Sequence, residues 1–341
     1  MTWKLRLRRF VIVIPLILTC AIAGCGRRTV VAAPPPAPAA AATTAPMPMA
    51  ADVRPDVPIA PQRREVAVLF KNGAGYTEVV TQLRKLLPIE TFRLTLIDVE
   101  AENSQRLLDS LRRRPGLVAV AVGLPAARIA RDQLNAPILF AQVFNYQELL
   151  VKGKAIRGVM AMPPLDLQVQ DWKKFDPKLR RVGLIVSERH IDLIAQAERA
   201  ADSAAITVKY EVSDSDRETL YLFKRLAPQI DGLWLLPDDR ILSPAVLREL
   251  LSYAASHGVR VCVFSDALLQ WGALMSASPT PEDIARTMRR VLEDMMADRT
   301  NALPPLTPLS EIVVRINAQV AGRFGLSFPP SASWVVRGER P

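Results

Sequence analysis

Cysteine and histidine, two side chains that commonly carry covalent chemistry or bind transition metals, are rare among the 341 residues of this chain. There are three cysteines, Cys20, Cys25 and Cys262, and two histidines, His190 and His257. A cysteine nucleophile needs a nearby base, and a structural zinc site needs about four ligands, so this set indicates neither Cys–His catalysis nor a metal centre. The sequence also has no P-loop, GxGxxG turn, GxSxG elbow or HExxH helix. We therefore expect a protein that is not an enzyme and has no cofactor.

Cys25 follows an apolar run near the N-terminus. Four basic residues and no acid precede this run, which extends from Phe10 to about Gly24. Its length suits a signal peptide, which needs roughly 7–15 apolar residues, better than a membrane span, which needs about 20. The segment Ile22-Ala23-Gly24-Cys25 resembles the lipobox of bacterial lipoproteins. The resemblance implies a signal peptide over 1–24, cleavage before Cys25, and a membrane anchor of palmitate or similar chains on Cys25. An uncleaved signal anchor is the alternative.

The residue after the cysteine bears on which membrane holds the protein. In lipoproteins of double-membraned bacteria, an aspartate at that position signals retention in the inner membrane, and this chain has Gly26 instead. The resemblance therefore implies a lipid-anchored protein that faces the periplasm, with the outer membrane slightly favoured.

The next part of the chain predicts a tether. Residues 25–62 comprise the expected lipidated cysteine and a segment rich in proline and alanine, with no apolar period and almost no charge. Such a composition cannot bury a core and behaves as a semi-extended linker.

The charge of the chain does not indicate a nucleic-acid partner. The formal net charge is +10, but four of the basic residues lie in the signal, and 112–114 is the one run of arginines. Without a basic stripe interleaved with aromatic residues, the charge is typical of a solvated surface. Because Cys262 is alone in the expected mature body, no intrachain disulfide can form there. Its setting in VRVCVFS predicts a buried strand residue.

From residue 63 onward, strand-like and helix-like patterns alternate. Continuous apolar strands separated by amphipathic helices indicate parallel sheets with helices on both faces. The first series predicts strands at 64–70, 92–99, 117–123 and 136–144, with helices at 77–87, 104–114 and 125–134. The second series predicts strands at 179–187, 206–212, 231–237 and 259–265, with helices at 191–204, 217–230 and 243–258. The fold class is therefore α/β, with two lobes of roughly 100 residues each.

Several segments resemble the ABC-transporter substrate-binding proteins whose better-known members bind tryptophan or tyrosine. They are LVAVAVGLPAARIARDQLNAPILFAQVFNYQELL (117–150), KAIRGVMAMPPLDLQVQDWKKFDPKLRRVGLIVS (154–187), the segment 231–294 with its LPDD turn and Trp-Gly-Ala-Leu sequence, and VVRINAQVAGRFGLSFPP (313–330). The resemblance implies a type 1 periplasmic-binding-protein-like fold. It divides the chain into a first lobe over 63–160 that is completed by about 273–300, a second lobe over 161–272, and a C-terminal strand, helix and tail over 301–341.

In this fold a ligand lies between the lobes, at the carboxyl ends of the strands, where helix N-termini favour anions. We therefore expect ligand-binding residues in the turns after the strands. In the first lobe they are Asn72, Tyr76, Gly123, Leu124, Asn145 and Tyr146, and in the second lobe they are Ser187, Asp238, Asp239, Ser265 and Asp266.

Some of these residues, and two residues outside this set, have a purely structural interpretation. Tyr76 would simply pack on the first helix, and Asp238-Asp239 followed by Arg240 would form a surface turn with an ion pair. Trp234 is predicted to be a core residue rather than a stacking platform. His190, at the end of a strand, is predicted to be a solvated loop residue.

The cleft departs from the family pattern. Leu124 stands where the family has threonine, Asn145-Tyr146 stands where it has Asp-Pro, and the glycine-rich crossover is reduced to KGKAIRGV. The main hypothesis is a lipid-anchored binding protein that closes on a small solute, such as an amino acid, and delivers it to an ABC permease. The alternative is an outer-membrane lipoprotein of the same fold that serves as a scaffold and binds an envelope protein partner instead of a solute.

Overall fold

Runs of β-branched and aliphatic residues form the strands of two separate sheets in the computed structural model, which describes residues 63–151, 153–327 and 333–337. These residues belong to one compact unit of the chain. The expected signal peptide, Cys25 and the whole of the tether over 25–62 lie outside the described residues. Among the described helices, none is long and apolar enough to cross a membrane.

The first sheet has the order β11-β5-β4-β3-β1-β2, and all of its pairings are parallel. Its strands are β1 (Arg64–Phe70), β2 (Phe92–Asp98), β3 (Val118–Val122), β4 (Ile138–Ala141), β5 (Ile156–Val159) and β11 (Leu306–Thr307). Alternate residues of β1 face opposite ways, as a strand requires. Val66 and Val68 pack with α1 (Ala74–Leu86) and α8 (Pro281–Met296). Ala67 and Leu69 pack with α2 (Ser104–Leu111) and α3 (Leu124–Gln133).

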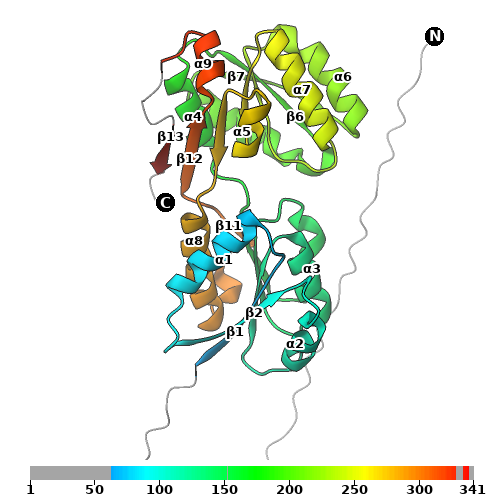
Figure 1. The fold of residues 1–341 in the computed structure, drawn as a ribbon, viewed down its shortest axis with the longest axis vertical. Helices are drawn as coiled ribbons and strands as arrows, with labels where there is room; N and C mark the ends of the chain where they lie inside the picture. Colours follow the sequence, from blue (N-terminus) through cyan, green and yellow to red (C-terminus); the bar gives the residue numbers. More distant parts are fainter. Residues whose placement is uncertain (1–62, 152, 328–332, 338–341) are drawn as a thin grey trace, which may run out of the picture. The chain divides into compact units, whose positions relative to one another are not determined.

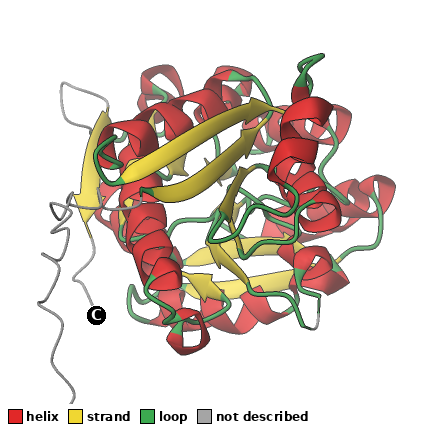
Figure 2. Cartoon of the chain, turned by 90° about the horizontal axis from the view of Figure 1, so that it is seen from below, coloured by secondary structure: helices red, strands yellow, loops and turns green. Residues whose placement is uncertain are grey.

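The second sheet has the order β13-β12-β10-β9-β8-β6-β7. Its strands are β6 (Arg181–Val186), β7 (Thr207–Val212), β8 (Gly232–Trp234), β9 (Arg260–Val263), β10 (Met275–Ser278), β12 (Glu311–Ile316) and β13 (Ser333–Arg337). β12 and β13 run antiparallel to their neighbours, and the other pairings are parallel. One face packs against α4 (Leu165–Phe175), α5 (Asp192–Asp202) and α9 (Ala318–Arg323), and the other against α6 (Asp216–Leu226) and α7 (Pro244–Ser256). Figures 1 and 2 show the two sheets with helices on both sides.

Short 3₁₀ helices follow several strands and helices. They are η1 (Tyr146–Leu149), η2 (Glu188–His190), η3 (Ala227–Gln229), η4 (Asp266–Trp271) and η5 (Thr300–Ala302). Three of them, η1, η2 and η4, come after the carboxyl ends of β4, β6 and β9, so they lie in the turns where ligand-binding residues are expected.

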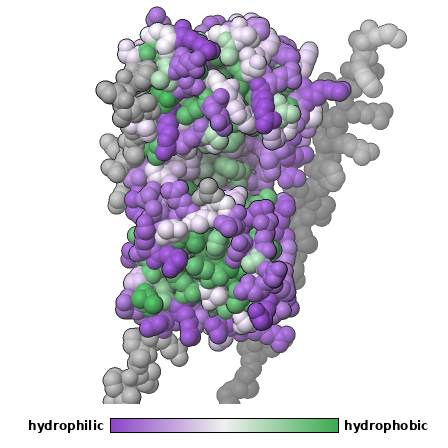
Figure 3. Space-filling view, in the orientation of Figure 1, coloured by the Kyte–Doolittle hydropathy of each residue, from purple (hydrophilic) through white to green (hydrophobic). Residues whose placement is uncertain are grey.

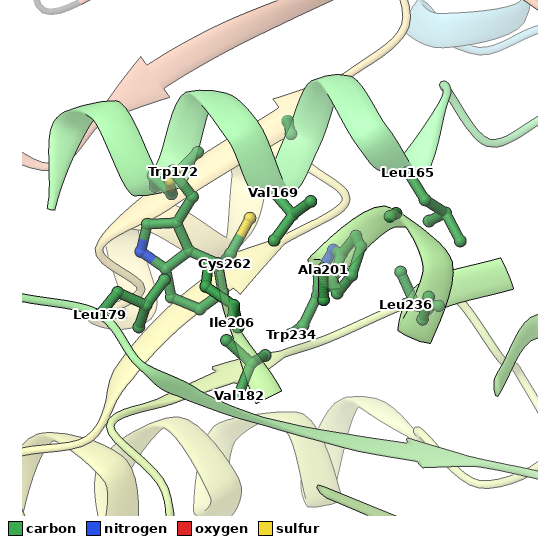
Figure 4. Packing of buried hydrophobic residues seen from close by; sticks show 14 of the residues in the cluster. Leu165, Val169, Trp172, Leu179, Val182, Ala201, Ile206, Trp234, Leu236 and Cys262 are labelled. Carbon is green, nitrogen blue, oxygen red and sulfur yellow. The ribbon is translucent and has the colours of Figure 1, made fainter. Parts of the chain in front are cut away.

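The core of the second lobe contains the largest buried side chains. Trp172 and Trp234 are at most 1% exposed, and Cys262 lies with them in the same cluster (Figure 4). The indole Nε1–H of Trp234 donates to Oε1 of Gln168 at 3.0 Å. The predictions that Trp234 is a core residue and that Cys262 is a buried strand residue are both confirmed. Burial also raises the pKa of the Cys262 thiol, which keeps it protonated and unreactive.

The chain crosses between the two sheets three times within the described residues, at 159–165, 278–281 and 307–311. The return to the first lobe comes later than the expected position near residue 273, because β10 pairs with β9 and β12 in the second sheet. The first lobe receives α8 and β11 instead.

Figure 3 shows apolar side chains on the viewed face of this lobe, beside α1.

Candidate functional site

A buried ion pair lies at the carboxyl ends of β6 and β8. Nδ1 of His190 is 3.0 Å from Oδ2 of Asp238, and the two residues are 6% and 5% exposed. The same carboxylate accepts hydrogen bonds from the backbone N–H of Ser187 at 3.1 Å and of Arg240 at 3.2 Å. Asp238 is therefore a fixed acceptor that holds the β6 turn against the turn after β8.

The electrostatics of this pair follow from its hydrogen bonds. Burial alone would raise the pKa of Asp238, but the hydrogen bonds from His190 and Ser187 outweigh burial and lower the pKa to about 2. The hydrogen bond to Asp238 raises the pKa of His190 against the opposing effect of burial, and the backbone of Phe144 adds to the rise. Since Phe144 belongs to the first lobe, the imidazole lies at the contact between the lobes.

A second polar contact joins the lobes beside this pair. Nδ2 of Asn145, which follows β4, donates to Oδ1 of Asp239, which follows β8. Asn145 is 8% exposed, whereas Asp239 is exposed. Asp239 thus contacts Asn145 directly, and Asp238 is connected to Phe144 through His190. The 238–239 turn therefore reaches two adjacent residues of the first lobe.

A cavity of about 70 Å³ opens next to these contacts and is lined from both lobes. The first lobe contributes mainly Val143, Phe144, Tyr146 and Gln147, and the crossover contributes Met160, Ala161 and Met162. The second lobe contributes His190, Asp192, Leu193, Gln196 and Pro237. Pockets that enclose a drug-sized molecule have roughly 300–1,000 Å³, so in this state the cavity accommodates only a small group.

The other expected residues of the first lobe lie around α1 and α3. The ring of Tyr76 covers Gly123, because a Cβ added at Gly123 would lie 2.9 Å from the ring. Gly123 has a φ of +87°, which a glycine adopts without strain. Oδ1 of Asn72 accepts from the hydroxyl of Thr77 at 3.2 Å, and Leu124 is partly buried against the core. Tyr76 belongs to α1 itself, and its ring packs over Gly123 at the start of α3, so its role in binding stays a prediction.

Asp266, which follows β9, makes its contacts within the second lobe. Its carboxylate accepts from the hydroxyls of Ser276 at 2.6 Å and Ser278 at 3.2 Å, and it pairs with Arg315 of β12. The neighbouring Ser265 is partly buried. Asp266 is thus neutralised locally, and among the described hydrogen bonds none joins Ser265 or Asp266 to the first lobe.

The structure therefore brings together five of the expected residues: Asn145, Tyr146, Ser187, Asp238 and Asp239. Their role in binding stays a prediction. The prediction of a solvated His190 is wrong, because its ring is buried against Asp238, while its backbone N–H donates to the Ser187 carbonyl at 2.9 Å. The surface turn proposed for 238–240 is wrong for Asp238, which is buried and bonded to His190.

Sequence reasoning missed the crossover and helix α5 as parts of this site. Met160 and Met162 line the cavity from the segment that links β5 to α4, and Asp192 and Gln196 line it from α5. Asp192 and Gln196 are four residues apart and so share one helix face, which was the available signal. Within the described ranges, no group of three or more His, Cys, Asp or Glu residues could hold a metal ion.

Several solved structures share this fold. An ABC domain in complex with L-Trp from Streptococcus pneumonia has a TM-score of 0.54 and 18% identity, over 80% of this chain and 97% of that one. An open, ligand-free substrate-binding protein with adhesive properties from Clostridium difficile has a TM-score of 0.58 and 15% identity, over 78% and 96%. A conserved domain protein from Vibrio cholerae has a TM-score of 0.52 and 15% identity, over 80% and 97%. No family model and no curated protein matches the chain.

These likenesses define the class of fold. Two mostly parallel sheets with helices on both faces and three crossovers form a type 1 periplasmic-binding-protein-like fold. The predicted fold class is confirmed. Identities of this size establish the fold alone, because one fold hosts many functions.

Proposed function

We propose that this protein binds a small solute between its two lobes and does not catalyse a reaction on it. The observation that carries this proposal is the cavity at the lobe contact, whose lining comes mainly from the turn after β4, η1, the crossover and α5. A solute at this position would contact both lobes at once, so its binding energy would favour the closed arrangement. The buried Asp238–His190 pair supplies a fixed polar wall for that closure.

The proposed setting is the bacterial cell envelope. The lipobox-like segment that ends at Cys25 supports a lipid anchor, and the Pro/Ala-rich segment supports a tether to a body that faces the periplasm. In this setting the protein would pass its solute to an ABC permease. Labelling of cells with radioactive palmitate tests the anchor: the protein should incorporate label, and Cys25→Ser should abolish it. Unlabelled wild-type protein would contradict lipidation.

One observation favours the scaffold as a second candidate. The cavity has only about 70 Å³, and the Asn145–Asp239 hydrogen bond joins the lobes directly. A body that closes on itself in this way presents a fixed surface, which an envelope protein partner would recognise. This candidate predicts a stable complex with an envelope protein and no response to solutes.

Thermal unfolding of the full chain separates the two candidates. The panel contains amino acids, organic anions, sugars and organic amines. A solute at 100 times its Kd should stabilise the folded state by about 2.7 kcal/mol, which is a measurable rise in Tm. If one class of solute stabilises the protein and Asp239→Ala reduces the effect, solute binding is supported. If none of the solutes raises Tm, solute binding is contradicted and the scaffold remains.

A further inference from the structure

Acidic and basic side chains are not balanced in the lining of the cavity between the lobes. Its charged lining residues are His190 and Asp192, and the lining includes no lysine or arginine. The positive charge of His190 is paired with the buried carboxylate of Asp238. Asp192 is exposed and has no salt bridge among the described residues. The cavity therefore presents a net negative charge to whatever enters it.

Aromatic rings of the first lobe lie on the other side of this charge. Phe144 is 39% exposed and lines the cavity together with Tyr146, whose ring stacks on Phe140 with a centroid distance of 6.5 Å. Asp192 lines the same cavity from the second lobe; burial raises the pKa of Tyr146, and the charge of Asp192 adds to the rise. Aromatic faces attract cations, and a nearby carboxylate adds to that attraction.

A wider groove continues from the cavity. It has about 490 Å³ and shares Met160, Met162 and Gln196 with the cavity. Much of its lining is apolar and includes Leu165, Ala200 and Leu309. Methionine side chains adapt to apolar chains of different shape. The groove also carries Asp166 and Arg199, whose charges are opposite and add no net charge.

Asp192 has an ordinary structural role as well. It is the first residue of α5, where a carboxylate stabilises the helix dipole. That role explains an acid at this position but not the aromatic rings opposite it or the lack of a basic lining residue. An α-amino acid would place its own carboxylate beside its amine, and the lining offers no lysine or arginine to pair with it.

We propose that the site between the lobes takes an organic cation, namely a primary amine on an unbranched apolar chain, and discriminates against the corresponding α-amino acid. The amine lies between Asp192 and the rings of Phe144 and Tyr146, and the chain passes Met160 and Met162 into the groove. This inference rests on the proposed function, because it names the class of solute for that site.

Four probes with the same six-carbon chain test the inference by calorimetric titration of the full-length protein. They are hexylamine, hexan-1-ol, hexanoate and norleucine. Hexylamine should bind at least roughly tenfold more tightly than the other three. Asp192→Asn should remove most of that advantage. Asp202→Asn, which makes the same change in an exposed residue at the other end of α5, should preserve it.

Each other outcome overturns the inference. Equal binding of hexylamine and hexan-1-ol would show an apolar site without a preference for cations. Tighter binding of hexanoate or norleucine would show that the site pairs with a carboxylate, and an amine preference that persists in Asp192→Asn would place the cation elsewhere. Failure of hexylamine to bind also overturns it. The proposed function survives all of these results if another solute stabilises the protein, and fails only if none does.

Discussion

Asn145 of the first lobe donates its side-chain amide to the carboxylate of Asp239 in the second lobe. The buried oxygen Oδ1 of Asn145 has no hydrogen-bond partner among the described atoms. A buried carbonyl without a hydrogen-bond partner costs free energy. The contact between the lobes therefore satisfies the nitrogen of this amide but not its oxygen. The side chain therefore joins the lobes through its amide nitrogen.

Asp239→Ala should shift the protein toward an open arrangement of its lobes. The lost hydrogen bond is charge-assisted but partly exposed, so we expect a change of about 1 kcal/mol, or about fivefold in the ratio of closed to open molecules. Distances between spin labels placed on α3 and α7 measure that ratio. Asp214→Ala, in an exposed turn of the second lobe, serves as the control. An unchanged distance distribution in Asp239→Ala would contradict the assigned role.

The His190–Asp238 pair should make stability depend on pH at both ends of the range. His190 has a raised pKa, so its contribution is complete below the ordinary value of 6.5 and is lost as pH rises through the folded-state pKa. Asp238 has a pKa of about 2 instead of 3.8, so its contribution is complete above 3.8 and is lost as pH falls through about 2. The contribution of the pair is therefore largest between these two limits.

Urea unfolding at a series of pH values measures this dependence. Asp238→Asn should lower the free energy of unfolding near pH 6 by roughly 2 kcal/mol, which corresponds to the lowered pKa. His190→Gln should flatten the decline at high pH, whereas His257→Gln, at an exposed position, should leave it unchanged. A decline of the same size in His190→Gln would mean that another group titrates.

The order of strands and helices could be predicted from sequence because each pattern is local. The expected strand at 64–70 coincides with β1, and the expected helix at 243–258 contains α7, whose N-cap Ser243 accepts from the N–H of Val246. Strands β5, β10 and β11 are not among the predicted strands. Their sheet is decided by pairing with distant segments, which no local pattern encodes.

The site could be predicted only in part, for a similar reason. Turns after parallel strands meet at one edge of a sheet, and this rule selected Asn145, Ser187 and Asp238. It gave no information about which turns face the other lobe, so it also selected Asp266, which pairs with Arg315. Burial of His190 depends on η2 and on the Asp238 carboxylate 48 residues away, and the polar sequence around His190 pointed to solvent instead.

Gly123→Ala should strain the turn that begins α3. The backbone at Gly123 has a φ of +87°, and a Cβ there would lie 2.9 Å from the ring of Tyr76. We expect a loss of about 1–3 kcal/mol from the backbone conformation, while the ring at the end of a flexible side chain moves aside. Gly116→Ala is the matched control, because Gly116 has a φ of +70° and open space around it.

Tyr76→Ala separates the two contributions in Gly123→Ala. If the backbone causes the loss, the free energy of unfolding of the Gly123→Ala protein should fall by the same amount with or without Tyr76. Full rescue of Gly123→Ala by Tyr76→Ala would show instead that the ring cannot move, and the Tyr76 ring would then be a rigid wall of the first lobe.

Trp234→Phe should destabilise the second lobe. Trp234 is 1% exposed, and its Nε1–H satisfies Oε1 of Gln168, which is itself 3% exposed. Phenylalanine would leave that oxygen unpaired and a small cavity beside it, at a cost of about 2–4 kcal/mol. Trp271→Phe should cost less than about 1 kcal/mol, because Trp271 is only partly buried, under Arg248. Urea unfolding gives both values. A loss below about 1 kcal/mol in Trp234→Phe would contradict the assigned packing and hydrogen bond of Trp234.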